Sequence, residues 1–333
     1  MEIRAYMKVL VCGGAGYIGS NMTAMLSAEG HQPIVYDNLS RGHKAAVRNA
    51  EFVKGDLADY ELLIKVLKKY KIEACLHFAA FIEVAESSQQ PLKYYHNNVS
   101  NTQTLLAAME AAGVEKFVFS STAAVYGMPK RVPITEDLHK EPINPYGETK
   151  WASERMCHWQ SEAGKLSYAA LRYFNAAGAG FDNTLGEDHR PESHLIPLII
   201  QAAMGKLESV KIYGTDYDTP DGTCVRDYIH IEDLCSAHLL ALEKLKDNRE
   251  LIYNLGNGRG FSVREVIDTV KKVSGKNFKV VETDRRSGDP AVLTSDATKA
   301  KKELGWKIQY PELERIVETA WRWHNKYPGG YKD

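Results

Sequence analysis

A glycine-rich turn near the N-terminus constrains the fold of this chain more than any other feature. The apolar residues 8–12 run directly into the sequence GGAGYIGS, in which Gly13, Gly16 and Gly19 recur at every third position. Gly14, Gly16 and Gly19 also satisfy the pattern G-x-G-x-x-G. Glycines at this spacing permit a tight turn and a close approach of the backbone to a ligand, and the helix that follows offers free N–H groups to a phosphate. The turn therefore predicts a strand, a dinucleotide-binding loop and a helix.

The first half of the chain alternates short apolar runs with amphipathic segments. Continuous apolar strands separated by helices are typical of a parallel sheet that is covered on both faces. The expected strands comprise residues 8–12, 33–37, 51–56, 74–78, 116–120 and 168–173, and the expected helices comprise residues 21–28, 60–70, 91–112 and 145–162. This pattern predicts an α/β protein with a Rossmann-type, doubly wound parallel sheet.

The second half of the chain is less regular. Residues 178–193 and 214–222 are rich in Gly, Asp, Pro and His, which is typical of loops. We therefore expect residues 1–175 to form the dinucleotide-binding domain and residues 176–333 to form a smaller, mixed α/β lobe that binds the substrate. A segment near residues 226–256 is expected to return to the main sheet. Two domains agree with the length of 333 residues, since a domain has about 100–200 residues.

Composition argues against several classes of partner. The chain is 44% hydrophobic and 26% charged, and its formal net charge of −1 gives no reason to expect nucleic acid or an anionic membrane. No apolar run reaches the ~18–20 residues of a membrane span, and the N-terminus lacks the apolar segment of a signal peptide. The five cysteines are scattered without a Cys-x-x-Cys pair, so we expect neither a disulfide framework nor a metal site. These observations favour a cytoplasmic protein.

An acidic residue at the end of the second expected strand favours NAD as the dinucleotide. Asp37 lies 18 residues after Gly19, where a carboxylate can hydrogen-bond the adenosine ribose and would repel a 2′-phosphate. Arg41 keeps NADP open as an alternative. Asp56, which is expected to end the third strand just before Leu57, either contacts the adenine or caps the next helix.

A tyrosine and a lysine one helical turn apart form the expected catalytic group. Tyr146-x-x-x-Lys150 follows Asn144-Pro145, and this spacing places a phenol and an ammonium on the same face of a helix. A phenol has an ordinary pKa of about 10, so it becomes a usable base only where positive charge stabilises the phenolate. Thr122, at the end of the fifth strand, offers a hydroxyl to the same substrate oxygen. Together with the dinucleotide loop, these residues predict proton and hydride transfer at the carbon of an alcohol.

With these motifs the chain resembles the extended short-chain dehydrogenase/reductase family and, within it, the 4-epimerases of UDP-glucose and UDP-galactose. The resemblance extends over almost the whole length. Its most specific parts lie beyond the core and are typical of sugar-nucleotide enzymes: Gly186-Glu187-Asp188, Val225-Arg226-Asp227-Tyr228-Ile229-His230, Tyr253-Asn254-Leu255-Gly256 and Arg285-Arg286-x-Gly288-Asp289. The resemblance implies epimerisation at C4 of a UDP-hexose through a 4-keto intermediate, with transient transfer of hydride to bound NAD.

The resemblance also implies which residues bind the cofactor and the substrate. Besides Lys150, Asp37 and the three glycines, the implied cofactor-binding residues are Tyr17, Ile18, Asn38, Asp56, Leu57, Phe78, Ala79, Ala80, Asn97 and Phe174. Besides Thr122 and Tyr146, the implied substrate-binding residues are Asn175, His194, Leu195, Tyr213, Arg226, Arg286, Asp289 and Leu293. Arg226 and Arg286 would clamp the diphosphate, where a planar, bidentate donor is well suited. Asp289 would hold the uridine ribose, and Tyr213 would pack on the uracil.

Four positions depart from the pattern that is frequent in this family. Thr122 replaces a serine but keeps the hydroxyl. Ile82 stands where many members have a cofactor-contacting lysine, and His194 stands where an asparagine is common. Leu293 occupies the position whose bulk limits groups on C2 of the sugar, and leucine is intermediate between a tyrosine and a small residue. A UDP-N-acetylglucosamine or UDP-pentose 4-epimerase therefore remains an alternative.

Two further functions remain as alternatives. A sugar-nucleotide 4,6-dehydratase or decarboxylase of the same fold would carry an acidic residue just after the strand-end hydroxyl, where this chain has Ala123 and Ala124. A non-catalytic NAD-binding regulator would be expected to lack the tyrosine or the lysine, and this chain has both.

Apolar side chains on two long helices predict the oligomeric state. Leu105, Met109, Trp151 and Met156 are expected to form exposed stripes on the helices that contain them. Two such helices from each of two subunits would pair as a four-helix contact, and the resemblance points to the same arrangement. A homodimer is therefore expected, since isologous packing is the commonest form of oligomer.

Overall fold

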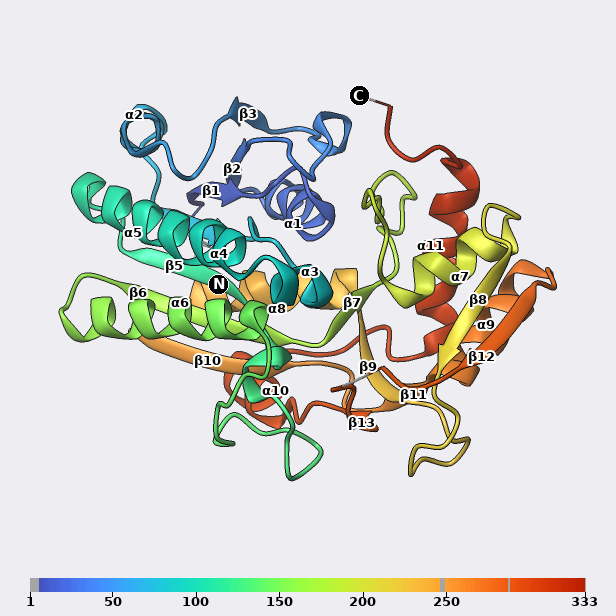
Figure 1. Ribbon diagram of the computed structural model, residues 1–333. Helices are drawn as coiled ribbons and strands as arrows, with labels where there is room; N and C mark the ends of the chain where they lie inside the picture. The colour runs from blue at the N-terminus through green and yellow to red at the C-terminus, as the bar shows by residue number, and fades with distance from the viewer. Residues whose placement is uncertain (1–5, 246–248, 287, 333) are drawn as a thin grey trace.

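Seven parallel strands form the main sheet of the protein (Figure 1). The computed structural model describes residues 6–245, 249–286 and 288–332. The strand order is β10-β6-β5-β4-β1-β2-β3, so the direction of winding reverses between β1 and β4. The strands are β1 (Lys8–Cys12), β2 (Gln32–Asp37), β3 (Glu51–Lys54), β4 (Ala74–His77), β5 (Lys116–Thr122), β6 (Ser167–Tyr173) and β10 (Glu250–Leu255). The prediction of a doubly wound parallel sheet is confirmed, and ligands of such sheets bind where the winding reverses.

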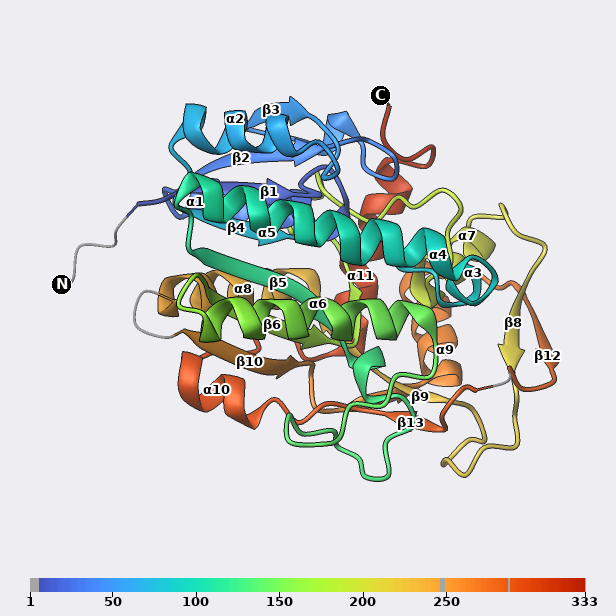
Figure 2. The same cartoon turned by 60° about the vertical axis from the view of Figure 1, so that its left-hand side comes forward.

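Helices cover both faces of this sheet, which explains the continuous apolar strands. On one face α1 (Tyr17–Ala28) and α8 (Ile231–Lys244) pack together, with Leu26 and Leu242 in a shared core. On the other face lie α2 (Tyr60–Tyr70), α5 (Asn101–Ala112) and α6 (Pro145–Glu162). Figure 2 shows α5 and α6 running side by side in front of the sheet. Val9, Leu10 and Val11 of β1 are therefore completely buried.

Capping residues set the starts of two helices on this face. Asp59 accepts a hydrogen bond from Leu62 N (3.0 Å) and so caps α2. The alternative in which Asp56 caps that helix is therefore wrong, because β3 already ends at Lys54 and Asp56 lies in the turn between them. Asn144 caps α6 by accepting a hydrogen bond from Gly147 N (2.9 Å), and Pro145 occupies the first helical position.

The expected helix at residues 91–112 is continuous in space but not uniform. It begins as α4 (Pro91–Tyr94), widens into a π-helical turn at Tyr95–Ser100, and continues as α5. The short helix α3 (Val84–Gln89) precedes it. A π-helical turn inside a longer helix is frequently found at a functional site.

Most of the remaining elements form two smaller groups beside the main sheet. One part is built from β8 (Ser209–Tyr213) and β12 (Lys279–Thr283), with α7 (Leu195–Ala203), α9 (Val263–Ser274) and α11 (Leu313–Lys326) around them. The other part is a small sheet of β7 (Asn175–Ala177), β9 (Val225–His230), β11 (Gly260–Ser262) and β13 (Val292–Leu293). The helix α10 (Thr298–Leu304) packs back against α8 and β10.

The expected exposed stripe on α5 is wrong. Leu105 and Met109 are fully buried against the main sheet, because α5 turns its apolar side inward. Exposed apolar side chains on this side of the molecule include Leu92 (81% exposed), Tyr95 (40%) and Trp159 (61%). Within the described ranges, no helix is long and apolar enough to cross a bilayer.

Candidate active site

A cavity of about 460 Å³ opens at the carboxyl ends of the central strands. It is lined by all the expected cofactor-binding residues: Gly13, Gly16, Tyr17, Ile18, Gly19, Asp37, Asn38, Asp56, Leu57, Phe78, Ala79, Ala80, Asn97, Lys150 and Phe174. It also contains the expected catalytic and substrate-binding residues Thr122, Tyr146, Asn175, His194, Arg226, Asp289 and Leu293. Three expected substrate residues, Leu195, Tyr213 and Arg286, are not among the described residues that line it. Segments far apart in the sequence thus meet in one space.

The glycine-rich loop packs tightly against neighbouring backbone because glycines occupy the positions where a side chain would clash. Gly13 has a φ of 78°, and a Cβ there would lie 2.6 Å from Ala79 N. A Cβ on Gly19 would overlap the carbonyl oxygen of Gly13. Helix α1 starts after Gly16, which has no side chain to cap it, so N–H groups of its first turn remain available to a pyrophosphate. The loop therefore fits a dinucleotide.

Asp37 joins this loop to the end of β2. Its carboxylate accepts hydrogen bonds from Ala15 N (3.0 Å) and Leu39 N (2.8 Å). Burial raises the pKa of this carboxyl, and the two backbone hydrogen bonds act in the opposite direction. Nearby, Asn38 Nδ2 donates to Asp56 Oδ2 at 2.7 Å, so both residues lie at the same edge of the cavity. This edge provides the acceptors that the adenosine end of a dinucleotide needs.

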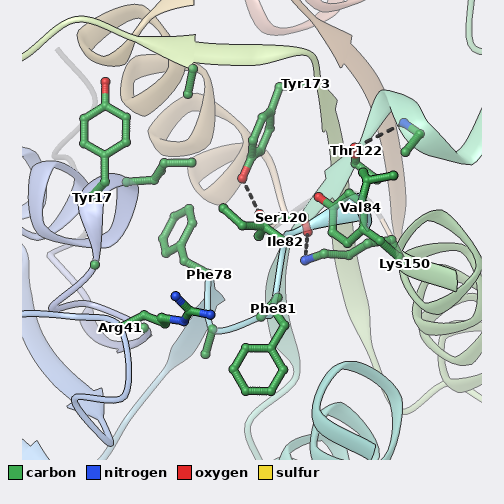
Figure 3. A pocket seen from close by; sticks show the side chains of 18 of the residues that line it. Tyr17, Arg41, Phe78, Phe81, Ile82, Val84, Ser120, Thr122, Lys150 and Tyr173 are labelled. Atoms are coloured by element: carbon green, nitrogen blue, oxygen red, sulfur yellow. Dashed lines mark hydrogen bonds between the residues drawn. The ribbon is translucent and has the colours of Figure 1, made fainter. Parts of the chain in front are cut away.

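Lys150 reaches the cavity from α6 and lies next to the strand-end hydroxyls (Figure 3). Its Nζ donates to Ser120 O at 2.8 Å, and the hydroxyl of Ser120 is hydrogen-bonded to that of Tyr173. Thr122 Oγ1 accepts from Ala124 N (3.1 Å), which orients its side chain. Burial lowers the pKa of Lys150 to about 7, and Glu154 acts in the opposite direction.

Tyr146 is the second residue of α6 and is partly accessible through the cavity. Desolvation by the surrounding protein raises its pKa, a hydrogen bond with Thr122 lowers it, and Glu83 adds to the rise. The N-terminus of a helix favours negative charge, so the position of Tyr146 in the first turn favours the phenolate. The phenol thus lies within hydrogen-bonding distance of the Thr122 hydroxyl, and their shared contact with a substrate oxygen stays a prediction.

The π-helical turn forms part of the cavity wall near these catalytic residues. It places Asn97 on the cavity and turns Asn98 toward the interior. The Asn98 amide pairs with the backbone N and O of Phe81 (2.9 and 3.0 Å) and donates to Thr149 Oγ1 (3.1 Å). Because Thr149 precedes Lys150, this bridge holds α6 against the loop after β4. Sequence reasoning missed Asn98, although its place in the pair Asn97-Asn98 pointed to this turn.

A buried ion pair supports Lys150 from the opposite side. Glu154, one turn after Lys150, forms a bidentate pair with Arg172 of β6 at 2.9 and 2.6 Å, and the two side chains are only 2% and 1% exposed. Ser121 donates to Glu154 from β5. Arg172 also donates to Tyr126 OH (2.8 Å), which donates to Asn254 of β10 (2.7 Å). This network connects α6 with three strands of the main sheet.

The substrate side of the cavity is built on β9 and β13. These strands are parallel, and their register places Leu293 beside Arg226. Arg226 Nη2 forms an ion pair with Asp289 Oδ1 at 2.8 Å, and Nη1 donates to Val225 O at 2.9 Å. Asn175 Nδ2 donates to Asp227 O (2.8 Å). The structure thus brings together Arg226, Asp289 and Leu293, the residues predicted to contact the diphosphate, the ribose and the sugar.

Tyr213 and Arg286 form a separate pair. The Arg286 guanidinium lies 3.7 Å from the centroid of the Tyr213 ring, and it lowers the pKa of that phenol. Gly288 and Asp289, which follow Arg286 after one position, do line the cavity. Arg286 therefore belongs to the segment that carries these cavity residues, and its side chain stacks on Tyr213 at the end of β8.

Comparison with known proteins agrees with this geometry. The profile of the NAD dependent epimerase/dehydratase family matches residues 9–256. The chain belongs to this family. It is 52% identical over 326 residues to the UDP-glucose 4-epimerase of Halalkalibacterium halodurans, with 98% of each chain covered. The sequence-based identification as an NAD-dependent epimerase is therefore confirmed.

Two solved structures extend the comparison. A UDP-glucose 4-epimerase from Brucella ovis in complex with NAD is 48% identical, with a TM-score of 0.93 over 95% of this chain and 98% of that one. The UDP-Glc/GlcNAc 4-epimerase of Campylobacter jejuni is 45% identical, with a TM-score of 0.85 over 96% of this chain and 99% of that one. NAD is thus the cofactor of this NAD-dependent epimerase, as Asp37 predicted.

Several cavity residues had no role in the sequence-based prediction. Ser120 and Tyr173 flank the catalytic group, and Glu187 and His189 lie on the wall beside Tyr17. The segment Gly186-Glu187-Asp188 had been recognised as typical of sugar-nucleotide enzymes, so a signal was present. Which of its side chains faces the cavity depends on the loop conformation, and sequence spacing does not determine that conformation.

Proposed function

We propose that this epimerase interconverts UDP-glucose and UDP-galactose by inverting the configuration at C4. The observation that supports the proposal most is the convergence in one cavity of the glycine-rich loop, the group of Thr122, Tyr146 and Lys150, and the wall that carries Arg226. The residues after the strand-end hydroxyl, Ala123 and Ala124, also line the cavity and carry no acid, which disfavours a dehydratase. The names of the relatives support the same reaction.

In this proposal Tyr146 exchanges the proton of the sugar 4-hydroxyl. Thr122 holds the same oxygen, and the ammonium of Lys150 together with the first turn of α6 stabilises the phenolate. Bound NAD would supply a reversible acceptor for the C4 hydride. The loop at Gly13–Gly19 and Asp37 would hold the dinucleotide throughout the cycle, because a hydride that is returned requires no exchange of cofactor.

Inversion requires the sugar to turn while the nucleotide stays fixed. Arg226 uses two N–H groups of its guanidinium in the contacts with Val225 and Asp289, so others remain for the diphosphate. We propose that Asn175 and His194 contact the sugar or its phosphate and that Leu195 borders them. Tyr213 and Arg286 would bind the uridine end. The 4-keto sugar would then present its opposite face to the cofactor.

We expect Leu293 to determine which sugars are accepted. Its place beside Arg226 on β13 puts it close to the proposed diphosphate site. In assays of the wild type with both classes of sugar, UDP-glucose and UDP-galactose should be the main substrates, with weak or no turnover of the N-acetyl sugars. Leu293→Tyr should remove any N-acetyl activity, and Leu293→Ala should raise it. Changes of this size in a pocket side chain alter the free energy of discrimination between substrates by about 1–3 kcal/mol. The ratio of N-acetyl sugar to hexose turnover should therefore shift roughly ten- to hundredfold.

A matched control distinguishes sugar selection by Leu293 from a general loss of packing. Leu138 packs in the same apolar cluster as Leu293 but is not among the described cavity residues, so Leu138→Ala should leave the sugar ratio unchanged. Equal turnover of UDP-glucose and UDP-N-acetylglucosamine by the wild type, unmoved by either Leu293 substitution, would refute this role of Leu293. Preference for a UDP-pentose would favour that alternative, and complete inactivity toward all UDP-sugars would favour a regulator.

We further propose a homodimer that packs α5 and α6 against their counterparts. The exposed Trp159 on α6 supports this surface, and Arg155 lies 5.4 Å from the centroid of its ring. Light scattering at micromolar concentration should give twice the single-chain mass of 37.3 kDa. Trp159→Glu should lower that mass, whereas Leu207→Glu, at an exposed leucine beyond α7, should not. A wild type of single-chain mass would exclude the dimer.

We also propose a cytoplasmic location. All five cysteines are free and buried, and none forms a disulfide, which is usual for proteins of a reducing compartment.

A further inference from the structure

Four side chains with metal-binding atoms converge on the cavity wall between β7 and α7. They are Glu187, His189, Glu192 and His194, and one donor atom from each lies within 4.8 Å of the other three. The Glu187 and Glu192 side chains are each 4% exposed, that of His189 is 17% exposed and that of His194 is 37% exposed. The sequence-based argument against a metal site rested on the spacing of the cysteines. It did not address this cluster, which contains no cysteine.

Four of the six separations between these donors lie close to those around a four-coordinate metal ion. His194 Nδ1 lies 2.8 Å from Glu187 Oε1 and 3.1 Å from Glu192 Oε1, and His189 Nδ1 lies 3.2 and 3.9 Å from the same two oxygens. Zinc–nitrogen and zinc–oxygen bonds of about 2.0–2.1 Å in a tetrahedron place neighbouring donors roughly 3.3 Å apart. The four N···O separations lie on both sides of that value.

Hydrogen bonds from the two rings to the carboxylates account for only two of the four N···O approaches. Each imidazole Nδ1 carries at most one hydrogen, so two N–H groups would have to serve four N···O approaches. Two carboxylates that are almost fully buried also need a compensating positive charge. A cation at the centre would contact all four donors and neutralise both carboxylates.

The surroundings hold the donors in place. Glu192 Oε1 accepts hydrogen bonds from Ser193 N (2.8 Å) and His194 N (2.9 Å), so the carboxylate is oriented by its own loop. The ring of Tyr17 meets that of His189 edge-on, at 6.4 Å between centroids. In many metal sites, neighbouring groups of this kind orient the ligands, and the oriented ligands hold the metal.

We propose that Glu187, His189, Glu192 and His194 bind a divalent transition-metal ion of the Zn²⁺ class. Imidazole donors disfavour Mg²⁺ and Ca²⁺, which prefer oxygen. Four protein ligands complete a tetrahedral shell, so the ion is structural and takes no part in the chemistry at C4. It clamps the loop at residues 187–194 to the start of α7, because His194 directly precedes that helix.

This inference also refines the substrate wall of the proposed function. Coordination through Nδ1 would leave the proton of His194 on Nε2, where it can donate to an oxygen of the substrate. Loss of the ion should therefore loosen substrate binding and raise KM more than it lowers kcat. The metal site itself does not depend on the identity of the substrate, so its test can succeed or fail independently of epimerase activity.

The test uses tag-free protein and measures metal directly. Elemental analysis of the purified wild type should find one equivalent of zinc or a related metal per chain. After removal by a chelator, added Co²⁺ should produce the intense visible absorption of a four-coordinate site. His189→Ala and the milder Glu192→Gln should each weaken Co²⁺ and Zn²⁺ binding by at least about tenfold. His158→Ala removes a histidine that pairs with Glu250 at 3.0 Å outside the cluster, and it should bind metal as the wild type does.

Two results would overturn the site. One is a folded wild type, verified by circular dichroism, that contains no metal and gives no visible Co²⁺ absorption, which would leave an ion-paired cluster. The other is metal binding that survives both His189→Ala and Glu192→Gln. Assays of UDP-galactose turnover on the same samples separate the two proposals. A metal-free enzyme whose KM equals that of the metal-bound enzyme refutes the clamp, and an inactive, metal-bound protein refutes the proposed reaction.

Discussion

Tyr146→Phe should reduce turnover by about 10²–10⁴-fold while the affinity for a UDP-sugar changes little. The substitution removes the hydroxyl that exchanges the proton at C4 but keeps the ring that lines the cavity. Initial rates with UDP-galactose give the loss of kcat, and calorimetric titration with UDP gives the affinity. The expected signature is a large fall in kcat with a nearly constant dissociation constant.

A second tyrosine serves as the matched control. The hydroxyl of Tyr70 is hydrogen-bonded to Glu51 (3.0 Å), and Tyr70 is not among the described residues that line the cavity. Tyr70→Phe should retain the wild-type rate. If Tyr146→Phe stayed within threefold of the wild type, another residue would have to be the proton acceptor, and Tyr173 or Thr122 would become the candidates.

Glu154→Gln should cost about 3–5 kcal/mol of the free energy of unfolding, because it leaves Arg172 charged in a buried site. The double substitution Glu154→Met with Arg172→Met removes both charges and should recover most of that loss. Urea unfolding followed by fluorescence measures the series. Glu314→Gln, which breaks the exposed pair with Lys272 at 2.6 Å, is the control and should cost at most about 1 kcal/mol.

The same substitution should change how activity depends on pH. Burial lowers the pKa of Lys150 to about 7 even though Glu154 acts in the opposite direction. Without that carboxylate the pKa of Lys150 falls further, so its ammonium is lost at lower pH. The alkaline decline of kcat in Glu154→Gln should therefore move to lower pH than in the wild type. A merely structural role would reduce stability without moving the profile, and an unchanged profile would contradict the support of Lys150 by Glu154.

The local features of the site could be predicted from the sequence because they depend on short spacings. The glycines of residues 13–19 and the pair Tyr146 and Lys150 lie within one loop or one helical turn. Backbone sterics and helical periodicity act over that distance, so strand, turn and helix followed from the residues themselves. The doubly wound order also followed, since apolar strands that alternate with helices have few other ways to be covered.

The sequence did not determine which neighbour covers the apolar side of a helix. Leu105 and Met109 form an apolar stripe in either case, but the stripe alone does not say whether a sheet or a second subunit covers it. The structure places both against the main sheet. The π-helical turn before α5 is a further feature that the spacing of the apolar residues did not predict.

Contacts between distant segments were decided only by the tertiary structure. By itself the sequence determined the elements, the dinucleotide loop and the proton-transfer pair, which are local. The pairing of Glu154 with Arg172, the register of Leu293 beside Arg226 and the convergence of Glu187 with His194 depend on how strands and loops pack. These contacts form when helices, strands and loops pack within each lobe, and the residue pattern along one segment does not identify the residues that it will contact.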